Sequence, residues 1–316
     1  KKSLIRFMDF MQKQPDGKDI ERFITENYHI YASSGAKDTG TVLYTGYYEP
    51  ALRGSRFPSE KNPYPVYGSP SDLITIDLSA FSTKYKGEKI RGRWNGKTVV
   101  PYYDREQIDV GQILAANLKP IVFVDDMVDL FFLHIQGSGR VYLEEGNFIN
   151  LHYHSTNGRP YRSIGKYLID TGKIERQEMS MQKIKEYLKS NPENIHDVLN
   201  FNPSYVFFEI REKGATGALG VTLTPGRSIA IDRKIFPDAA LAFVETQKPL
   251  IGINGQINRW TDFSRFVLSQ DTGGAIRGPG RVDLFWGNGP YAEIAAGHMQ
   301  HQGNLYFLVL KSTSNP

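Results

Sequence analysis

Cysteine is absent from all 316 residues of this sequence. Its absence excludes disulfide bonds, thiolate metal sites and a cysteine nucleophile in the chain as given. Long apolar runs are also missing, because runs such as 121–124 and 130–135 fall far short of the roughly 20 residues that a bilayer-spanning helix needs. We therefore expect a globular body without disulfides and without a membrane-spanning helix.

A strong excess of charge of one sign is lacking as well. The 38 Lys and Arg residues and 34 Asp and Glu residues leave a net charge of +4, and the cations are scattered, so we expect no nucleic-acid partner. The Gly-Ser-Gly segment 137–139 lacks the features of a phosphate loop and of a serine-nucleophile elbow. His152 and His154 alternate, but no acidic residue joins them in a recognised ligand pattern. We predict neither a metal nor an organic cofactor.

The length favours two domains, since single hydrophobic cores usually stop growing at about 250–300 residues. Apolar residues at helical spacing predict helices over 3–14 and 19–28. The β-branched and aromatic run 41–48 predicts a strand that Pro50 ends. We take the Pro- and Gly-rich run 58–70 as a crossing point between domains.

The rest of the chain alternates between apolar runs and segments of helical spacing. We predict helices over 110–117, 163–171 and 181–190. We predict strands over 121–125, 129–136, 141–143, 206–210, 228–231, 242–245, 265–269 and 305–310. Short strands separated by Gly and Pro turns are typical of a barrel, so the expected fold class is mainly β with a few helices.

The densest group of chemically useful residues spans 270–278 and 281–287. Asp271 ends one predicted strand, a glycine-rich turn follows, and Asp283 lies in the next strand twelve residues later. If the turn folds back, the two carboxyl groups converge. The alternative is a β-hairpin whose aspartates satisfy backbone donors.

Asp283 lies between Val282 and the apolar run 284–286. Burial there would raise the pKa of its carboxyl group toward the range of a general acid. Trp286 can stack on a sugar ring, although such rings more often belong to a core.

Two further clusters suggest a ligand surface. Gln136 precedes Gly137-Ser138-Gly139 at the end of a predicted strand, where its amide suits a sugar hydroxyl or acetamide group. His134, in the same strand, is interpreted as a hydrogen-bonded sheet residue. Tyr47 and Tyr48 point to opposite faces of the strand 41–48, so at most one of them lines a groove. Glu49 is interpreted as an exposed hinge residue, with a second carboxylate as the alternative.

These clusters, together with 223–230 and 161–166, resemble the membrane-bound lytic murein transglycosylase A family. The similarity runs from about residue 41 to 310, and its most specific part is the Asp-Thr-Gly-Gly-Ala-Ile segment followed by Asp-Leu-Phe-Trp-Gly. The resemblance implies a double-psi β-barrel built from residues 1–49 and 214–316. It also implies a smaller β domain, inserted over 50–213, and a groove for glycan.

The resemblance places the family's catalytic Asp on Asp283 and its supporting Asp on Asp271. Tyr291 stands where some relatives carry an acid, and Glu293 follows two residues later. The candidate substrate-binding residues come from the three clusters: Tyr47, Tyr48, Gln136, Gly137, Ser138, Gly273, Gly274, Ala275 and Trp286.

The implied reaction is cleavage of peptidoglycan between N-acetylmuramic acid and N-acetylglucosamine with formation of a 1,6-anhydro ring, with Asp283 acting first as acid and then as base. The implied location is the periplasm, with a lipid anchor outside this chain and glycan strands as the partner. Two alternatives stay open. One is a lysozyme-like hydrolase that uses Asp271 and Asp283, and the other is a non-catalytic glycan-binding protein.

Overall fold

The computed structural model describes residues 1–312, and the chain divides into two compact units. Unit 1 combines residues 1–48 with the segment that begins at Thr216, and unit 2 is Glu49–Ala215. These boundaries lie one and two residues from the predicted domain boundaries. The predicted crossing point at 58–70 is wrong, because this run lies inside unit 2.

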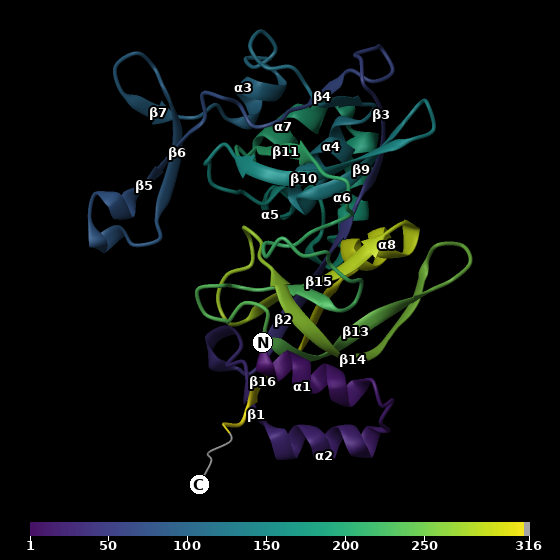
Figure 1. Ribbon diagram of the computed structural model, residues 1–316. Coiled ribbons are helices and arrows are strands. Elements are labelled where there is room, and N and C mark those ends of the chain that lie inside the picture. Colours follow the sequence, from purple (N-terminus) through teal and green to yellow (C-terminus); the bar gives the residue numbers. More distant parts are fainter. Residues whose placement is uncertain (313–316) are drawn as a thin grey trace. The chain divides into compact units, whose positions relative to one another are not determined.

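Unit 1 is built around a closed barrel of six strands (Figure 1). Its elements are α1 (Lys2–Met11), α2 (Gly17–Asn27), β1 (Tyr28–Ala32), β2 (Val42–Glu49), β12 (Ser228–Ala230), β13 (Leu241–Ile251), β14 (Ile257–Asp271), β15 (Arg281–Asn288), α8 (Pro290–His298) and β16 (Gln300–Leu310). The strand order is β16-β13-β14-β12-β15-β2, and β2 pairs with β16 to close the ring. The predicted barrel from both parts of the chain is therefore confirmed.

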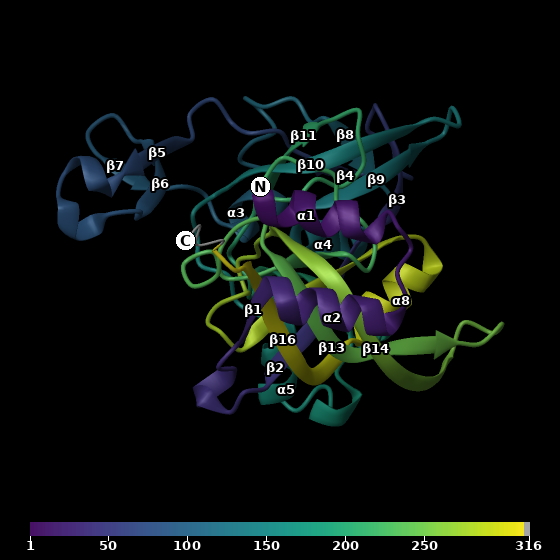
Figure 2. The same cartoon turned by 60° about the horizontal axis from the view of Figure 1, so that its bottom comes forward.

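The long strand β16 closes the barrel because different parts of it pair with different neighbours. Residues 300–303 pair with β2, 304–307 with β13, and 306–310 with β1. The helices α1 and α2 lie across this side of the barrel (Figure 2), where Ile24 and Tyr28 share a core cluster with Leu308. Hydrophobic burial thus fixes the N-terminal helices on the barrel.

Unit 2 contains a six-stranded sheet of order β11-β10-β9-β3-β8-β4. Its strands are β3 (Ala51–Ser55), β4 (Tyr64–Val66), β8 (Val122–Val124), β9 (Ser138–Leu143), β10 (Phe148–Thr156) and β11 (Val206–Ile210). A bridge between Gly68 and Phe208 brings the two edge strands together, so the sheet curls into a nearly closed barrel. The helices are α3 (Arg105–Asp109), α4 (Met127–Gln136), α5 (Ile164–Asp170), α6 (Met181–Ser190) and α7 (Ile195–Asn200). A separate sheet holds β5 (Ile74–Asp77), β6 (Lys89–Trp94) and β7 (Val99–Pro101).

Two predicted elements of unit 2 are wrong. The run 129–136 is not a strand but most of helix α4, which Asp126 caps by accepting hydrogen bonds from the amides of Val128 and Asp129. Six of its ten residues are buried, five of them in the unbroken run 130–134, so the apolar positions give no clear helical period. The predicted helix over 110–117 is also wrong. The helix lies earlier, in α3, where Asp104 and Gln107 form a capping box.

The other predicted elements are confirmed, with shifted ends. Ser163 and Ser180 cap α5 and α6, respectively, as side-chain acceptors. The strand predicted over 242–245 lies near the start of β13, and the one over 265–269 lies near the end of β14; these strands are 11 and 15 residues long. Within residues 1–312, no helix is long and apolar enough to cross a membrane.

Candidate active site

Asp283 lies in β15 of unit 1, on the face of the strand opposite to its two apolar neighbours. Val282 and Leu284 are 0 % exposed, whereas Asp283 is half-buried. Because successive side chains of a strand point to opposite faces, the core residues fix Asp283 on the other side of the barrel wall. Its position is therefore set by packing.

Strand β12 places Asp271 and Asp283 on the same face of the sheet. Ala230 is the register partner of Asp271 in β14 and of Asp283 in β15. Residues paired across strands point the same way, so the two carboxylates flank Ala230, with backbones about 10 Å apart. The convergence of the two aspartates is thus produced by the sheet. The hairpin of the alternative interpretation is wrong, because β12 separates β14 from β15. Its other part holds for Asp271, whose carboxylate accepts hydrogen bonds from two backbone amides.

Strand β2 supplies one hydroxyl group to each aspartate. The Thr45 hydroxyl donates to Asp283 Oδ1 at 2.6 Å, and the Tyr47 hydroxyl donates to Asp271 Oδ2 at 2.9 Å. The two donors are two residues apart and therefore lie on one face of β2. Arg281 Nη2 donates in turn to the Thr45 hydroxyl at 3.3 Å. Neither Thr45 nor Arg281 was among the predicted site residues.

Asp271 is held by three hydrogen-bond donors. Besides Tyr47, the backbone amides of Ala218 and Thr272 donate to its Oδ1 at 2.9 and 2.8 Å. Burial raises the pKa of Asp271 above its usual range, although these hydrogen bonds oppose the rise. Three of its four acceptor positions are thus occupied, which suits a residue that holds its surroundings in place.

Asp283 differs from Asp271 in having fewer donors and a clearly raised pKa. Burial raises the pKa of Asp283 to about 6, and the negative charge of Asp271 adds a smaller rise. The Thr45 hydrogen bond and the positive charge of Arg281 act in the opposite direction. A carboxyl group with this pKa carries its proton at mildly acidic pH and can both donate and accept it.

Tyr47 remains a proton donor at any physiological pH. Burial raises the pKa of its hydroxyl group well above the usual value, and the neighbouring charge of Asp271 raises it further. Its ring lies 5.2 Å from that of Phe285. Tyr47 is thus oriented by packing on one side and by Asp271 on the other.

The glycine-rich segment after β14 is tied down by a residue that the sequence did not single out. Asp232 is 5 % exposed, and its carboxylate accepts hydrogen bonds from the amides of Gly278 and Lys234. Gly273 is half-buried, whereas Gly274 and Ala275 are exposed. No atom lies within 4 Å of the position that a Gly274 side chain would occupy, so this part of the segment is open.

Two of the predicted substrate-binding residues belong to the core instead. Trp286 is 7 % exposed, and its indole nitrogen donates to Met299 Sδ at 3.4 Å. Tyr48 is 3 % exposed, which leaves Tyr47 as the member of the pair on the face of the aspartates. Stacking of either buried ring on a sugar is therefore excluded in this conformation. The apolar character of 284–286 reflects the barrel core.

Glu49 is not the exposed hinge residue that the sequence suggested. It is 2 % exposed, and its Oε2 forms an ion pair with Arg140 Nε at 2.9 Å. Both residues belong to unit 2. The pair joins the start of this unit to strand β9.

The predicted cluster around Gln136 lies in unit 2, at the junction of α4 and β9. Gln136 ends the helix, Gly137 takes a left-handed conformation at φ 79°, and Ser138 begins the strand. All three are half-buried. Gln136 is thus presented by a helix end and not by a strand. His134 is a buried helix residue whose Nδ1 lies 3.1 Å from Arg105 Nη1.

The remaining candidates have structural contacts. Tyr291, 44 % exposed, donates from its hydroxyl group to the Pro249 carbonyl oxygen, and Glu293 lies in the first turn of α8. His152 Nε2 lies 2.9 Å from the Lys213 carbonyl oxygen. Within residues 1–312, no three His, Asp or Glu side chains are grouped so that they could hold a metal ion.

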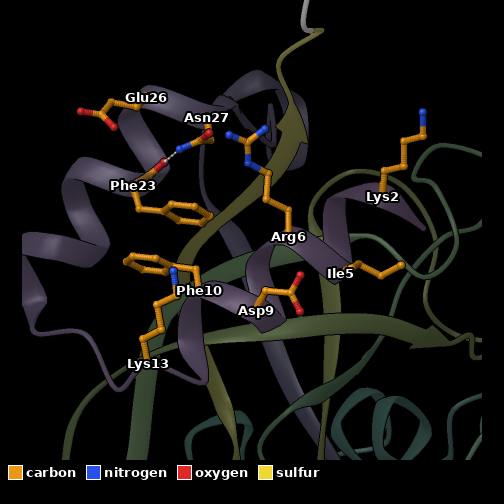
Figure 3. A pocket seen from close by; sticks show the side chains of 9 residues that line it. All are labelled: Lys2, Ile5, Arg6, Asp9, Phe10, Lys13, Phe23, Glu26 and Asn27. Carbon is orange, nitrogen blue, oxygen red and sulfur yellow. Dashed lines mark hydrogen bonds between the residues drawn. The ribbon is translucent and has the colours of Figure 1, made fainter.

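A cavity of about 570 Å³ lies beside α1 and α2 (Figure 3). Its lining includes the stacked rings of Phe10 and Phe23 and charged groups of both signs, such as Arg6 and Glu26. None of the predicted site residues lines it. The cavity is therefore separate from the two aspartates.

Comparison with known proteins connects both units to one family. Residues 43–209 match the family model described as MltA specific insert domain, and residues 227–309 match the 3D domain. Membrane-bound lytic murein transglycosylase A of Escherichia coli K12 is 31 % identical over 303 residues, covering 95 % of this chain and 73 % of that protein.

Solved structures give the same result. The membrane-bound lytic murein transglycosylase from Agrobacterium tumefaciens aligns with a TM-score of 0.79 at 30 % identity, covering 94 % of this chain and 80 % of that one. E. coli MltA with bound chitohexaose aligns with a TM-score of 0.78 at 26 % identity, covering 98 % and 84 %. The chain therefore belongs to the membrane-bound lytic murein transglycosylase A family.

Proposed function

We propose that this protein is a peptidoglycan lytic transglycosylase that cleaves the β-1,4 bond between N-acetylmuramic acid and N-acetylglucosamine. The observation that carries the proposal is Asp283, a half-buried carboxyl group whose pKa burial raises to about 6. Relatives of this chain carry the name lytic murein transglycosylase, and the crystal structure of one of them contains bound chitohexaose.

In the proposed reaction, Asp283 serves as acid and then as base. The protonated carboxyl group donates to the glycosidic oxygen while the bond from that oxygen to the muramyl C1 breaks through an oxocarbenium-like transition state. The resulting carboxylate then takes the proton of the muramyl C6 hydroxyl group as its oxygen bonds to C1. This step closes the 1,6-anhydro ring and returns the proton to Asp283, and no water is consumed.

The neighbours of Asp283 support this cycle through position and charge. Thr45 fixes one oxygen of Asp283, while the charge of Asp271 favours the protonated form of that carboxyl group. We assign Gln136, Ser138 and the backbone of Gly273 and Gly274 to glycan binding. General acid–base catalysis contributes about 10²- to 10⁴-fold, so glycan positioning must supply much of the remaining acceleration.

A two-carboxylate hydrolase is the second candidate, and one observation favours it. Asp271 and Asp283 face the same side across a single strand, and inverting glycosidases hold their carboxyl groups about 6.5–9.5 Å apart. A base that activates water needs free acceptor positions, however, and three donors already leave Asp271 only one of its four. We therefore favour the single-acid reaction.

The mass of the products distinguishes these reactions. We expect purified peptidoglycan, incubated with the protein without added metal, to release muropeptides about 18 Da lighter than hydrolytic ones, because the anhydro ring forms with no uptake of water. Mass spectrometry before and after borohydride reduction is the measurement. Reducible products would establish the hydrolase, and release of no product would favour a glycan-binding protein.

The proposal also predicts the pH dependence of cleavage and its origin. Asp283 must be protonated to donate, so activity is present at acidic pH and falls as pH rises through about 6. Thr45→Val removes a hydrogen bond that lowers this pKa, so the falling limb should move to higher pH. Thr25→Val on α2, whose hydroxyl group bonds only within its own helix, is the control. A limb that stays in place in Thr45→Val would contradict the assignment.

We also propose a periplasmic location, since murein is found there, with a lipid anchor in a part of the protein outside this chain. Relatives are named membrane-bound. Peptidoglycan glycan strands are the proposed partner.

A further inference from the structure

The small sheet β5-β6-β7 of unit 2 has one apolar face. Trp94 of β6 pairs with Val99 of β7, and Ile90 of β6 pairs with Ile76 of β5. Trp94 and Ile90 are four residues apart in one strand, so all four side chains lie on the same face. This sheet is separate from the six-stranded sheet of the same unit (Figure 1).

This apolar face is exposed. Trp94 is 56 % exposed, Ile90 49 % and Val99 39 %. No apolar side chain between residues 74 and 101 is buried, so the sheet has no core of its own. Two more exposed aromatic rings, Phe81 and Tyr85, follow β5 in the connection to β6. We call the five exposed residues Phe81, Tyr85, Ile90, Trp94 and Val99 the flap surface.

The opposite face of the same sheet contacts other parts of unit 2. Arg91 Nη1 donates to the Thr156 hydroxyl group at 2.6 Å, and the Arg93 guanidinium lies 4.2 Å from the ring centre of Tyr103. Because Arg91 and Arg93 alternate with Ile90 and Trp94, these contacts orient the sheet with its apolar face outward. The exposure of the flap surface therefore follows from the contacts of Arg91 and Arg93 on the other face.

The segment is also strongly basic. Residues 72–101 contain six Lys and Arg against three Asp and Glu, a net charge of +3, whereas the whole chain carries +4. Four of the six cations are the lysines Lys84, Lys86, Lys89 and Lys97, all exposed. Charge of this density attracts a polymer with acidic groups.

We propose that the flap surface is a second binding site for peptidoglycan, made of residues other than those proposed to cut it. Sugar rings and acetamide methyl groups stack on Trp94 and its apolar neighbours, and the carboxylates of the stem peptides lie near Lys84, Lys86 and Lys97. This inference rests on the proposed function for the identity of the polymer. The aromatic rings alone would also suit a protein partner, but the four exposed lysines disfavour one, because lysine is depleted in protein interfaces.

Binding to insoluble sacculi tests the inference without interference from cleavage. In an Asp283→Asn background, we expect Trp94→Ala to weaken co-sedimentation about tenfold, as loss of a Trp anchor typically does. Phe57→Ala is the matched control, since Phe57 is 72 % exposed in unit 2 but outside the flap. Paired Lys84→Glu and Lys86→Glu changes should weaken binding at 50 mM salt, with a much smaller effect near 1 M.

Further measurements separate this inference from the proposed function. With Asp283 intact, Trp94→Ala should cleave short soluble glycans at the parent rate and sacculi more slowly. Equal sacculus binding by Trp94→Ala and its parent would overturn the inference. This result is the one expected if the flap surface binds an acidic protein instead of peptidoglycan. A dimer that Trp94→Ala converts to monomer would also overturn it, because a second copy would then cover the surface. Trp94-dependent binding without any cleavage would leave the inference standing and remove the proposed function.

Discussion

Asp283→Asn should lower the rate of peptidoglycan cleavage about 10²- to 10⁴-fold while leaving sacculus binding unchanged. The amide has nearly the same shape and still accepts the Thr45 hydrogen bond, which is 2.6 Å long in the native protein. It cannot, however, give a proton to the glycosidic oxygen, and this loss accounts for the size of the effect. Release of soluble muropeptides, normalised to the amount of protein bound, is the measurement.

The same substitution should stabilise the folded chain at alkaline pH. The pKa of Asp283 is raised to about 6 by folding, from a usual value of 3.8. Its charge is therefore tolerated less well in the folded state than in the unfolded state. The resulting penalty is absent below about pH 4 and grows to the order of 2–3 kcal/mol above pH 6. An Asn has no such penalty, so its advantage in urea unfolding should appear at pH 8 and vanish at pH 4.

Asp262→Asn is the control for both effects. Asp262 lies in β14, as Asp271 does, but its side chain is exposed. This substitution should leave both cleavage and stability within experimental error. Native turnover by Asp283→Asn would remove this residue from its proposed role. An Asp283→Asn protein less stable than the parent at pH 8 would show that its charge is favourable in the fold.

The sequence was a good guide to the parts of the site that depend on local patterns. Asp283 stands out because apolar residues flank it in a strand, and Asp271 because it precedes a glycine-rich turn. Both aspartates lie on one face of the barrel. Strands 206–210 and 41–48 could likewise be found from β-branched and aromatic runs.

The missed site residues depend on contacts between distant segments. Thr45 reaches Asp283 across 238 positions of sequence, and Asp232 holds the amide of Gly278 from 46 positions away. Nothing local marks either residue. Trp286 was predicted to bind substrate but lies in the core. An aromatic residue beside a catalytic candidate has the same sequence pattern whether it faces the substrate or the core.

Helix α4 shows a different limit of sequence patterns. Five consecutive residues of this helix, 130–134, are buried, and Leu130 and Leu133 belong to the core cluster of unit 2. A fully buried helix and a fully buried strand then have similar composition. The decisive signals were the caps, Asp126 at one end and Gly137 at the other. These caps place Gln136 at a helix end, so stability of this helix matters for the proposed glycan contact.

Arg105→Ala should lower the stability of unit 2 by an amount on the order of 3–5 kcal/mol. Arg105 is 1 % exposed, and its guanidinium group donates to the carbonyl oxygens of Asn202 and Ser204 at 3.1 and 2.7 Å. It also forms an ion pair with Asp109 at 3.3 Å and contacts His134 of α4. Removal leaves two carbonyl oxygens without their side-chain donor and the half-buried Asp109 carboxylate without its cation, which costs far more than the loss of one contact.

Two measurements test this effect. Urea unfolding gives the loss of stability, and amide hydrogen exchange shows in which unit the loss occurs. We expect faster exchange in α3 and α4, with unit 1 as the internal reference. Lys166→Ala, which breaks an exposed ion pair with Asp170 in the same unit, should cost no more than about 0.5 kcal/mol. Arg105→Lys should recover little, because an ammonium group cannot reproduce the planar fork that reaches two carbonyl groups and a carboxylate at once. Native stability in Arg105→Ala would mean that Asp109 is protonated in the fold and that α4 is held by its apolar contacts alone.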